Sequence, residues 1–179
     1  FWFRCLSALP LLLAASLLPA ASPTEYDVKL VYLYNFTKFV SWPESTFPTP
    51  EAPLNICVLG NMPETDTLKT LTQRKTRNRP ITLTLIKEKP DPNCHILFVT
   101  RDIASRKLDA LLKQLSPSTL LVGETSNFAR ETGTIGFVTD ERHRARIEVN
   151  LDKARQQELN IRAQLLEIAR KVYRDEEPS

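Results

Sequence analysis

The sequence predicts an α/β domain built on a mainly parallel β-sheet with helices on both faces. Short apolar, β-branched runs alternate along the chain with segments of helical periodicity, which is the pattern of βαβ units. Several of these runs are apolar throughout, as in strands buried on both faces. The 179 residues, of which 42% are hydrophobic and 25% charged, suit one globular domain. The predicted architecture is a Rossmann-like sandwich that ends in a hairpin and a helix.

The chain opens with the features of a secretory signal peptide. Arg4 precedes an apolar run over 6–18, and small residues suited to cleavage follow that run. Prolines interrupt the run, so it falls short of the roughly 20 apolar residues that a membrane anchor needs. We therefore expect residues 1–22 to be a signal peptide and residues 23–179 to be a single domain. The mature protein is expected outside the cytoplasm, in an oxidising compartment, and without a membrane span.

The first predicted element of the domain is a helix over 25–41. Thr24 can cap its start and Pro43 stops it, and one face carries an apolar stripe of Val28, Tyr32, Phe36 and Phe39. Further apolar residues make this helix apolar almost all round. Either its own domain covers both sides, or one side meets another protein. A strand over 54–59 follows, and Gly60-Asn61 marks the turn into the next helix.

The rest of the chain continues the alternation. Strands are predicted over 81–86, 95–99, 119–123, 134–138 and 146–150, and helices over 64–73, over 102–115, from Phe128, over 151–157 and from Asn160. The last two strands form a hairpin around 140–144, which adds a mixed edge to the sheet. Asn160 caps the last helix, whose apolar stripe is Ile161, Leu165, Ile168 and Val172.

The charge and motif content argue against several functions. The 24 Lys and Arg residues against 21 Asp and Glu are too evenly balanced for a nucleic-acid-binding protein. His95 and His143 lack the spacing of a metal site, and the glycines form no phosphate-binding loop. No nucleophile-elbow motif is present. The sequence therefore predicts a protein that is not an enzyme, with no catalytic residues, cofactor or metal.

Two cysteines, Cys57 and Cys94, remain in the predicted mature chain. They lie in strands separated by one βα unit, and such strands are often neighbours in a doubly wound sheet. In an oxidising compartment they can form a disulfide, and two buried free thiols are the alternative. A strained or accessible disulfide could also act as a redox sensor.

Two short segments, Arg74–Arg79 and Arg142–Arg146, are rich in basic residues. Both fall in predicted turns, where charged side chains are commonly solvated. The other interpretation is a surface for an acidic partner or for anionic lipid headgroups.

The string Tyr26–Pro43 is highly specific, and further strings follow it in order at Leu54–Gly60, Cys94–Val99, Val122–Glu124, Phe128–Ala129, Arg146–Asp152 and Leu165–Ala169. Together they resemble the YfiR-like family of periplasmic regulators, and they span nearly the whole mature chain. The resemblance implies a parallel-sheet α/β fold and a tendency to form homodimers. It also implies a regulator that binds the periplasmic domain of an inner-membrane diguanylate cyclase. Binding holds the cyclase inactive, which lowers cyclic di-GMP and with it exopolysaccharide and biofilm formation.

Particular residues carry over by position. The two cysteines match the family's pair in the corresponding strands, whereas a second disulfide of well-studied members has no counterpart, because 133–138 contains no cysteine. Redox control through that second bond is therefore not expected. Partner contacts in the family involve the C-terminal strand and helix, which makes Glu148 the leading candidate. Leu165 and Ile168 fall in the matching helix, either as partner contacts or as core residues.

Two other functions remain open. A small-molecule-binding module would use the crevice at the carboxyl ends of the strands, near Gly60-Asn61 and Thr100-Arg101. A sensor subunit for an unrelated membrane receptor or transporter is the third possibility.

Overall fold

The computed structural model describes residues 22–86 and 93–174, so residues 1–21 of the predicted signal peptide lie outside the described residues. The helices are α1 (Glu25–Phe39), η1 (Glu44–Thr46), α2 (Asp66–Thr72), α3 (Ser105–Leu112), α4 (Phe128–Glu131), α5 (Leu151–Gln156) and α6 (Ala163–Glu167). The strands are β1 (Val40–Ser41), β2 (Leu54–Leu59), β3 (Lys75–Thr76), β4 (Arg79–Ile86), β5 (Ile96–Val99), β6 (Leu120–Gly123), β7 (Ile135–Thr139), β8 (Ala145–Asn150), β9 (Asn160–Ile161) and β10 (Lys171–Tyr173).

The main sheet of the described chain has the strand order β10-β8-β7-β6-β5-β2-β4-β3. Strands β4, β2, β5, β6 and β7 run parallel, which confirms the predicted mainly parallel α/β class. β7 and β8 form the predicted antiparallel hairpin. That hairpin was expected at the edge of the sheet, and this is wrong, because β10 pairs in parallel with β8 and takes the edge.

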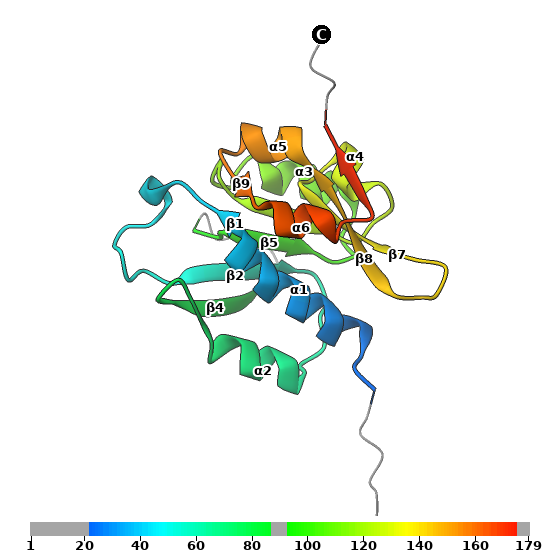
Figure 1. The fold of residues 1–179 in the computed structure, drawn as a ribbon, viewed down its shortest axis with the longest axis horizontal. Helices are drawn as coiled ribbons and strands as arrows, with labels where there is room; N and C mark the ends of the chain where they lie inside the picture. The colour runs from blue at the N-terminus through cyan, green and yellow to red at the C-terminus, as the bar shows by residue number, and fades with distance from the viewer. Residues whose placement is uncertain (1–21, 87–92, 175–179) are drawn as a thin grey trace, which may run out of the picture.

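Helices cover both faces of the sheet, as the fold class requires (Figure 1). Side chains alternate along each strand, so Ile56 and Val58 of β2 join the core cluster that contains Leu30 and Leu33 of α1. Their neighbours Cys57 and Leu59 join a second cluster with Leu108 and Leu111 of α3 and with Phe128 of α4. Both faces of the parallel strands are thereby removed from water.

Helix α1 begins where the sequence predicts. The Thr24 hydroxyl accepts a hydrogen bond from the Asp27 amide, and the Asp27 carboxylate accepts one from the Thr24 amide, which is a capping box. The buried side chains are Lys29, Leu30, Leu33, Phe36 and Thr37. Of the predicted stripe, Phe36 is buried, Tyr32 and Phe39 are half-buried against the same core cluster, and Val28 is half-buried in the wall of a surface cleft. A helix that is apolar almost all round does not reveal from its spacing which side faces the sheet. Its own domain covers most of it, and Val31 stays exposed.

The end of α1 and the C-terminal region differ from the prediction for one reason. β1 pairs antiparallel with β9, so α1 stops at Phe39 and Asn160 belongs to a strand instead of a helix cap. The predicted last helix is reduced to α6, and the chain then forms β10 against β8. Pairing between segments far apart in sequence has overridden the local helical periodicity.

The basic segment Arg74–Arg79 is not a simple solvated turn. It forms the tight β3–β4 connection, in which Arg79 is buried and donates to the carbonyl oxygens of Thr49 and Ala52 at 2.8 and 3.1 Å. The Arg79 guanidinium also lies 3.8 Å from the centre of the Phe47 ring. This arginine holds the proline-rich loop against the sheet.

Candidate functional site

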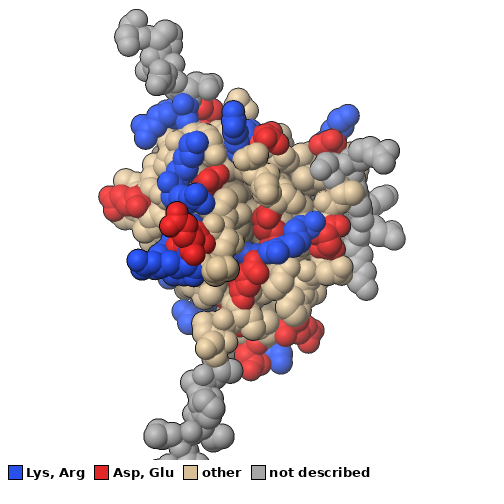
Figure 2. All heavy atoms as spheres, turned by 90° about the vertical axis from the view of Figure 1, so that its right-hand side faces the viewer, with Lys and Arg blue, Asp and Glu red and all other residues tan. Residues whose placement is uncertain are grey.

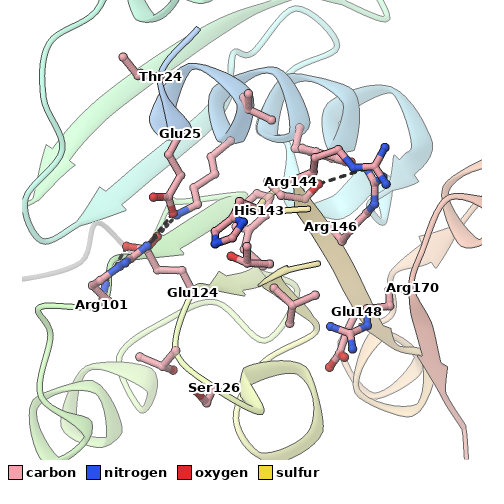
Figure 3. A pocket seen from close by; sticks show the side chains of 18 of the residues that line it. Thr24, Glu25, Arg101, Glu124, Ser126, His143, Arg144, Arg146, Glu148 and Arg170 are labelled. Atoms are coloured by element: carbon pink, nitrogen blue, oxygen red, sulfur yellow. Dashed lines mark hydrogen bonds and ion pairs between the residues drawn. The ribbon is translucent and has the colours of Figure 1, made fainter. Parts of the chain in front are cut away.

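A cleft of about 1320 Å³ lies at the carboxyl ends of the parallel strands β5, β6 and β7. The first turns of α1 form one side and the β7–β8 hairpin forms the other, while residues that follow β5 and β6 close the base (Figure 3). Open α/β sheets bind their ligands at this edge, because the loops after parallel strands meet there. The cleft is therefore the candidate functional site.

The predicted crevice is only partly correct. Of the four residues named for it, Arg101 lines the cleft, whereas Gly60, Asn61 and Thr100 do not. Gly60 takes a positive φ of 110° in the turn after β2, and the next residue, Asn61, donates to the Asp102 carboxylate from its amide at 3.3 Å and from its side chain at 2.8 Å. Asn61 therefore bonds within its own turn instead of lining the cleft.

A charge cluster that is buried at Lys29 and Glu124 and exposed at Glu25 and Arg101 lies at the α1 end of the cleft. We call Glu25, Lys29, Arg101 and Glu124 the α1 charge cluster. Lys29 is 3% exposed and contacts both Glu25 and Glu124, and the Glu124 side chain is only 1% exposed. Arg101 donates from its backbone amide to Glu124 at 2.8 Å and from its guanidinium to Glu25 at 2.6 Å (Figure 3). Two cations and two carboxylates satisfy one another, which is what burial of charge requires.

The cluster shifts the pKa values of two of its members, Glu25 and Arg101, and of the neighbouring Tyr26. The hydrogen bond from Lys29 lowers the pKa of Glu25. Burial, followed by the charge of Glu124, raises the pKa of Tyr26, whose hydroxyl donates to Glu124 at 3.3 Å. The hydrogen bond to Glu124 raises the pKa of Arg101. Each shift favours the protonation state that the cluster needs to stay paired near neutral pH.

The hairpin end of the cleft has a different construction. Asp140 accepts hydrogen bonds from the backbone amides of Arg142 and Arg144 at 2.9 Å, and its carboxylate pairs with the guanidinium groups of Arg144 at 2.9 Å and Arg146 at 3.2 Å. The amide of Arg144 is the largest cause that lowers the pKa of Asp140 to about 2. The carboxylate thus organises the turn, and the arginines project from it (Figure 3).

The structure places Glu148 on β8, where it lines the cleft and is half-buried. It accepts a hydrogen bond from the Tyr173 hydroxyl of β10 at 2.9 Å. Burial and this hydrogen bond raise the pKa of Tyr173, and the nearby charge of Arg170 opposes the rise. Arg170 also lines the cleft, just before β10. Glu148, Tyr173 and Arg170 therefore form one corner of the site.

The two other candidate contact residues separate clearly. Leu165 is fully buried in the core cluster that α1 covers, so its side chain has no surface to offer a partner in this fold. Ile168 is 51% exposed at the end of α6, shortly before Arg170. Of the pair, Ile168 alone is placed to contact another protein.

The cysteines form a disulfide between Cys57 of β2 and Cys94, which lies two residues before the start of β5, with 5.8 Å between their Cα atoms. The two strands are neighbours, as the βα spacing predicts. Closing a loop of 37 residues contributes about 4 kcal/mol on the chain-entropy model. Both cysteines are buried against α3, so the accessibility that a redox sensor needs is absent from this fold.

Sequence reasoning missed the α1 charge cluster, although signals for it exist. Arg101 and Glu124 follow adjacent parallel strands, whose ends must lie side by side. Lys29 is a lone cation in an apolar stretch, one helical turn after Glu25. A buried lysine needs a carboxylate partner, and the strand ends supply one.

Two searches of the described residues bear on the chemistry of the site. No group of three or more His, Cys, Asp or Glu side chains there is arranged to hold a metal ion. None of the helices in this part of the chain has the length and apolarity to cross a membrane.

Comparisons with known proteins bear on the family of this chain. A family model described as YfiR/HmsC-like matches residues 26–170, which is most of the chain. No curated protein matches. Among solved structures, the chain is similar to a conserved domain protein from Vibrio cholerae O1 biovar El Tor, with 11% identity and a TM-score of 0.43 over 67% of this chain. It spans 55% of that protein's length. The breadth of the family match shows that the chain belongs to the YfiR/HmsC-like family.

Proposed function

We propose that the protein binds the periplasmic domain of an inner-membrane diguanylate cyclase and holds the cyclase inactive. YfiR-like proteins are periplasmic regulators of diguanylate cyclases and not enzymes, and family membership supports that general role. Repression is then a matter of differential binding, because the free energy of docking favours the inactive state of the cyclase. Release of the protein raises cyclic di-GMP, which promotes exopolysaccharide and biofilm formation. Residues 1–22 would direct export and 23–179 would form the working domain, alone or as a homodimer.

One observation carries the proposed docking surface. Ile168 is one of the few exposed large apolar side chains among the described residues, and it precedes Arg170, a member of the corner with Glu148 and Tyr173, by two residues. An exposed apolar anchor next to a polar, charged rim is the usual composition of a protein interface. Ile168 and Glu148 are therefore the proposed contact residues, whereas Leu165 supports them from the core.

The test measures cyclic di-GMP in cells of the source organism that lack the gene. Deletion should raise cyclic di-GMP, and the full chain should restore the low level. A version without residues 1–22 should fail to restore it, because it stays in the cytoplasm. Ile168→Asp tests the surface against Val31→Asp, a change at an exposed apolar residue of α1 outside the cleft. If the two variants repress the cyclase equally well, Ile168 is not part of the interface.

A second function, binding of a small molecule in the cleft, is favoured by one observation. The cleft occupies the edge where open α/β sheets hold their ligands. A ligand there would tune docking through Glu148 and would not replace it. Thermal-shift screening of the exported domain tests this function, and the absence of any stabilising compound in a broad metabolite set would argue against it.

A further inference from the structure

The charges of the cleft differ in how far water and partners can reach them. At the hairpin end we call Arg144, Arg146 and Arg170 the rim arginines. Arg144 is 53% exposed, whereas the Asp140 carboxylate that it pairs with is 19% exposed. Figure 2 faces this end of the molecule, and Lys and Arg side chains gather on the left half of the view. Asp and Glu side chains lie among them, but the exposed charged residues that line the cleft at this end, Arg144 and Arg170, are basic.

The carboxylates of Asp140 and Glu148 already accept hydrogen bonds from their own chain, whereas Glu141 of the hairpin is exposed and lies outside the cleft. Both oxygens of Asp140 accept hydrogen bonds from the hairpin, and Glu148 accepts one from Tyr173. At the other end, Glu124 is buried and receives Lys29 and Arg101. A guanidinium has five N–H donors, and these carboxylates use only part of those that the rim arginines offer. The remaining donors face the cleft.

Arg170 is the clearest case. It is exposed, it lines the cleft, and its side chain has no hydrogen bond or ion pair with any residue that the structure describes. An exposed arginine without an ion pair among the described residues keeps its guanidinium donors available to an acidic group of a partner. Arg142 on the same hairpin is exposed in the same way but lies outside the cleft, which makes it a matched reference.

The size of the cleft favours a stretch of polypeptide as its occupant. Its volume of about 1320 Å³ exceeds the roughly 300–1,000 Å³ of pockets that enclose a small molecule. The cleft extends from the first turns of α1 to the β7–β8 hairpin, so a stretch of chain can lie along it.

We propose that the cleft receives an acidic segment of the partner protein, with carboxylates that bind the rim arginines. This inference rests on the proposed function, in which the partner is the periplasmic domain of the cyclase. The negative charge of Glu148 repels a carboxylate placed directly against its own side chain, so the acidic groups of the segment contact the arginine side chains. The segment presents carboxylates to Arg144, Arg146 and Arg170 and an uncharged or donor group to Glu148.

A binding experiment tests the cleft without the cyclase. The exported domain is titrated into fluorescein-labelled hexaglutamate, with hexaglutamine as the uncharged control, and anisotropy reports binding. Arg170→Glu should weaken hexaglutamate binding at least about tenfold, and Arg142→Glu should change it about twofold or less, since both variants alter net charge equally. Raising NaCl from about 50 to 300 mM should weaken binding to the wild type more than to Arg170→Glu. Equal effects of the two substitutions would overturn the proposal, as would displacement of the peptide by equimolar phosphate.

Cells separate this inference from the proposed function. If deletion of the gene leaves cyclic di-GMP unchanged while Arg170 governs peptide binding, the proposed function fails and the acidic-segment site stands with another partner. If deletion raises cyclic di-GMP and Arg170→Glu restores repression as well as the wild type does, the proposed function stands and the inference is wrong. Loss of repression in Arg170→Glu, with Arg142→Glu as active as the wild type, supports both.

Discussion

The two ends of the cleft use the same residue types under opposite conditions. At the α1 end, Lys29 and Glu124 are almost completely buried, and their charges pair inside the fold. At the hairpin end, Arg144 and Arg170 are exposed to water. The nearby carboxylates of Asp140 and Glu148 accept hydrogen bonds from donors of their own chain. Removing one partner of a buried ion pair strongly destabilises a protein, whereas an exposed charge contributes little to stability. The first end is therefore built to hold α1 on the sheet, and the second is free to recognise a partner.

The largest expected effect tests the buried end. Lys29→Met leaves the Glu124 carboxylate buried with only Arg101 and Tyr26 as partners, so we expect a loss of about 3 kcal/mol in the free energy of unfolding. Urea denaturation measures it. The control is Lys38→Met on the same helix, where the exposed ammonium lies 4.1 Å from the centre of the Tyr34 ring, with an expected loss of about 0.5 kcal/mol. Similar losses in the two variants would break the contrast between the two ends.

A smaller effect on stability is expected at Glu148, which is half-buried and so intermediate between the buried Lys29 and the exposed rim arginines. Glu148→Gln keeps an acceptor for Tyr173 but removes the charge, so the expected loss is about 1 kcal/mol of stability, and the pKa of Tyr173 should fall. Stability comes from urea denaturation, and a spectroscopic pH titration against Tyr173→Phe isolates the tyrosine. Repression then decides the role. If Glu148→Gln alone loses repression, Glu148 contacts the partner. If both variants lose it, Glu148 acts by positioning Tyr173, and normal repression by both removes the corner from the interface.

A pH-dependent effect tests how the hairpin is held. The pKa of Asp140 is about 2 in the folded protein against 3.8 for the free group, so its stabilising contribution is present above about pH 4 and is lost as the pH falls towards 2. Asp140→Asn should remove this dependence and speed amide exchange in the hairpin at every pH. Amide exchange followed by NMR between about pH 5 and 2 measures both effects. A wild-type hairpin whose exchange shows no added loss of protection over that interval would contradict the assignment.

The smallest expected effect concerns the exposed rim. Arg170→Glu and Arg142→Glu should each change the free energy of unfolding by less than about 0.5 kcal/mol, because neither side chain bonds to a residue in the described part of the chain. Thermal unfolding of the two variants beside the wild type provides the measurement. A large loss of stability in Arg170→Glu alone would assign Arg170 a structural role and would weaken the contrast between the two ends of the cleft.

Strand prediction succeeded where the local pattern was unambiguous. Leu54–Leu59 is a strand with the predicted bounds, and the hairpin of β7 and β8 forms around Asp140. A strand buried on both faces has a nearly continuous apolar run, which the sequence displays directly. The helix predicted over 102–115 is confirmed only as Ser105–Leu112, since helix ends depend on local caps and packing.

The site was less accessible to sequence reasoning. The carboxyl edge of the sheet was identified correctly, and Arg101 and Glu148 were both named, but the side chains that the cleft brings together come from α1, β8 and the loops after β5 and β6. Only the strand order decides that Arg101 and Glu124 are neighbours. The resemblance to the YfiR-like family suggests the C-terminal strand and helix as the partner surface, but it does not distinguish Leu165 in the core from Ile168 at the surface.

The sequence by itself determined the α/β class, the position of the capped first helix, the spacing that allows a disulfide between Cys57 and Cys94, and the family. These features depend on local patterns or on specific strings. The tertiary structure alone decided which side of α1 is buried, that 160–161 and 171–173 are strands, and that Lys29 meets Glu124. Each of these depends on contacts between segments distant in sequence, and the free energy of those contacts exceeds the local preferences that a single sequence displays.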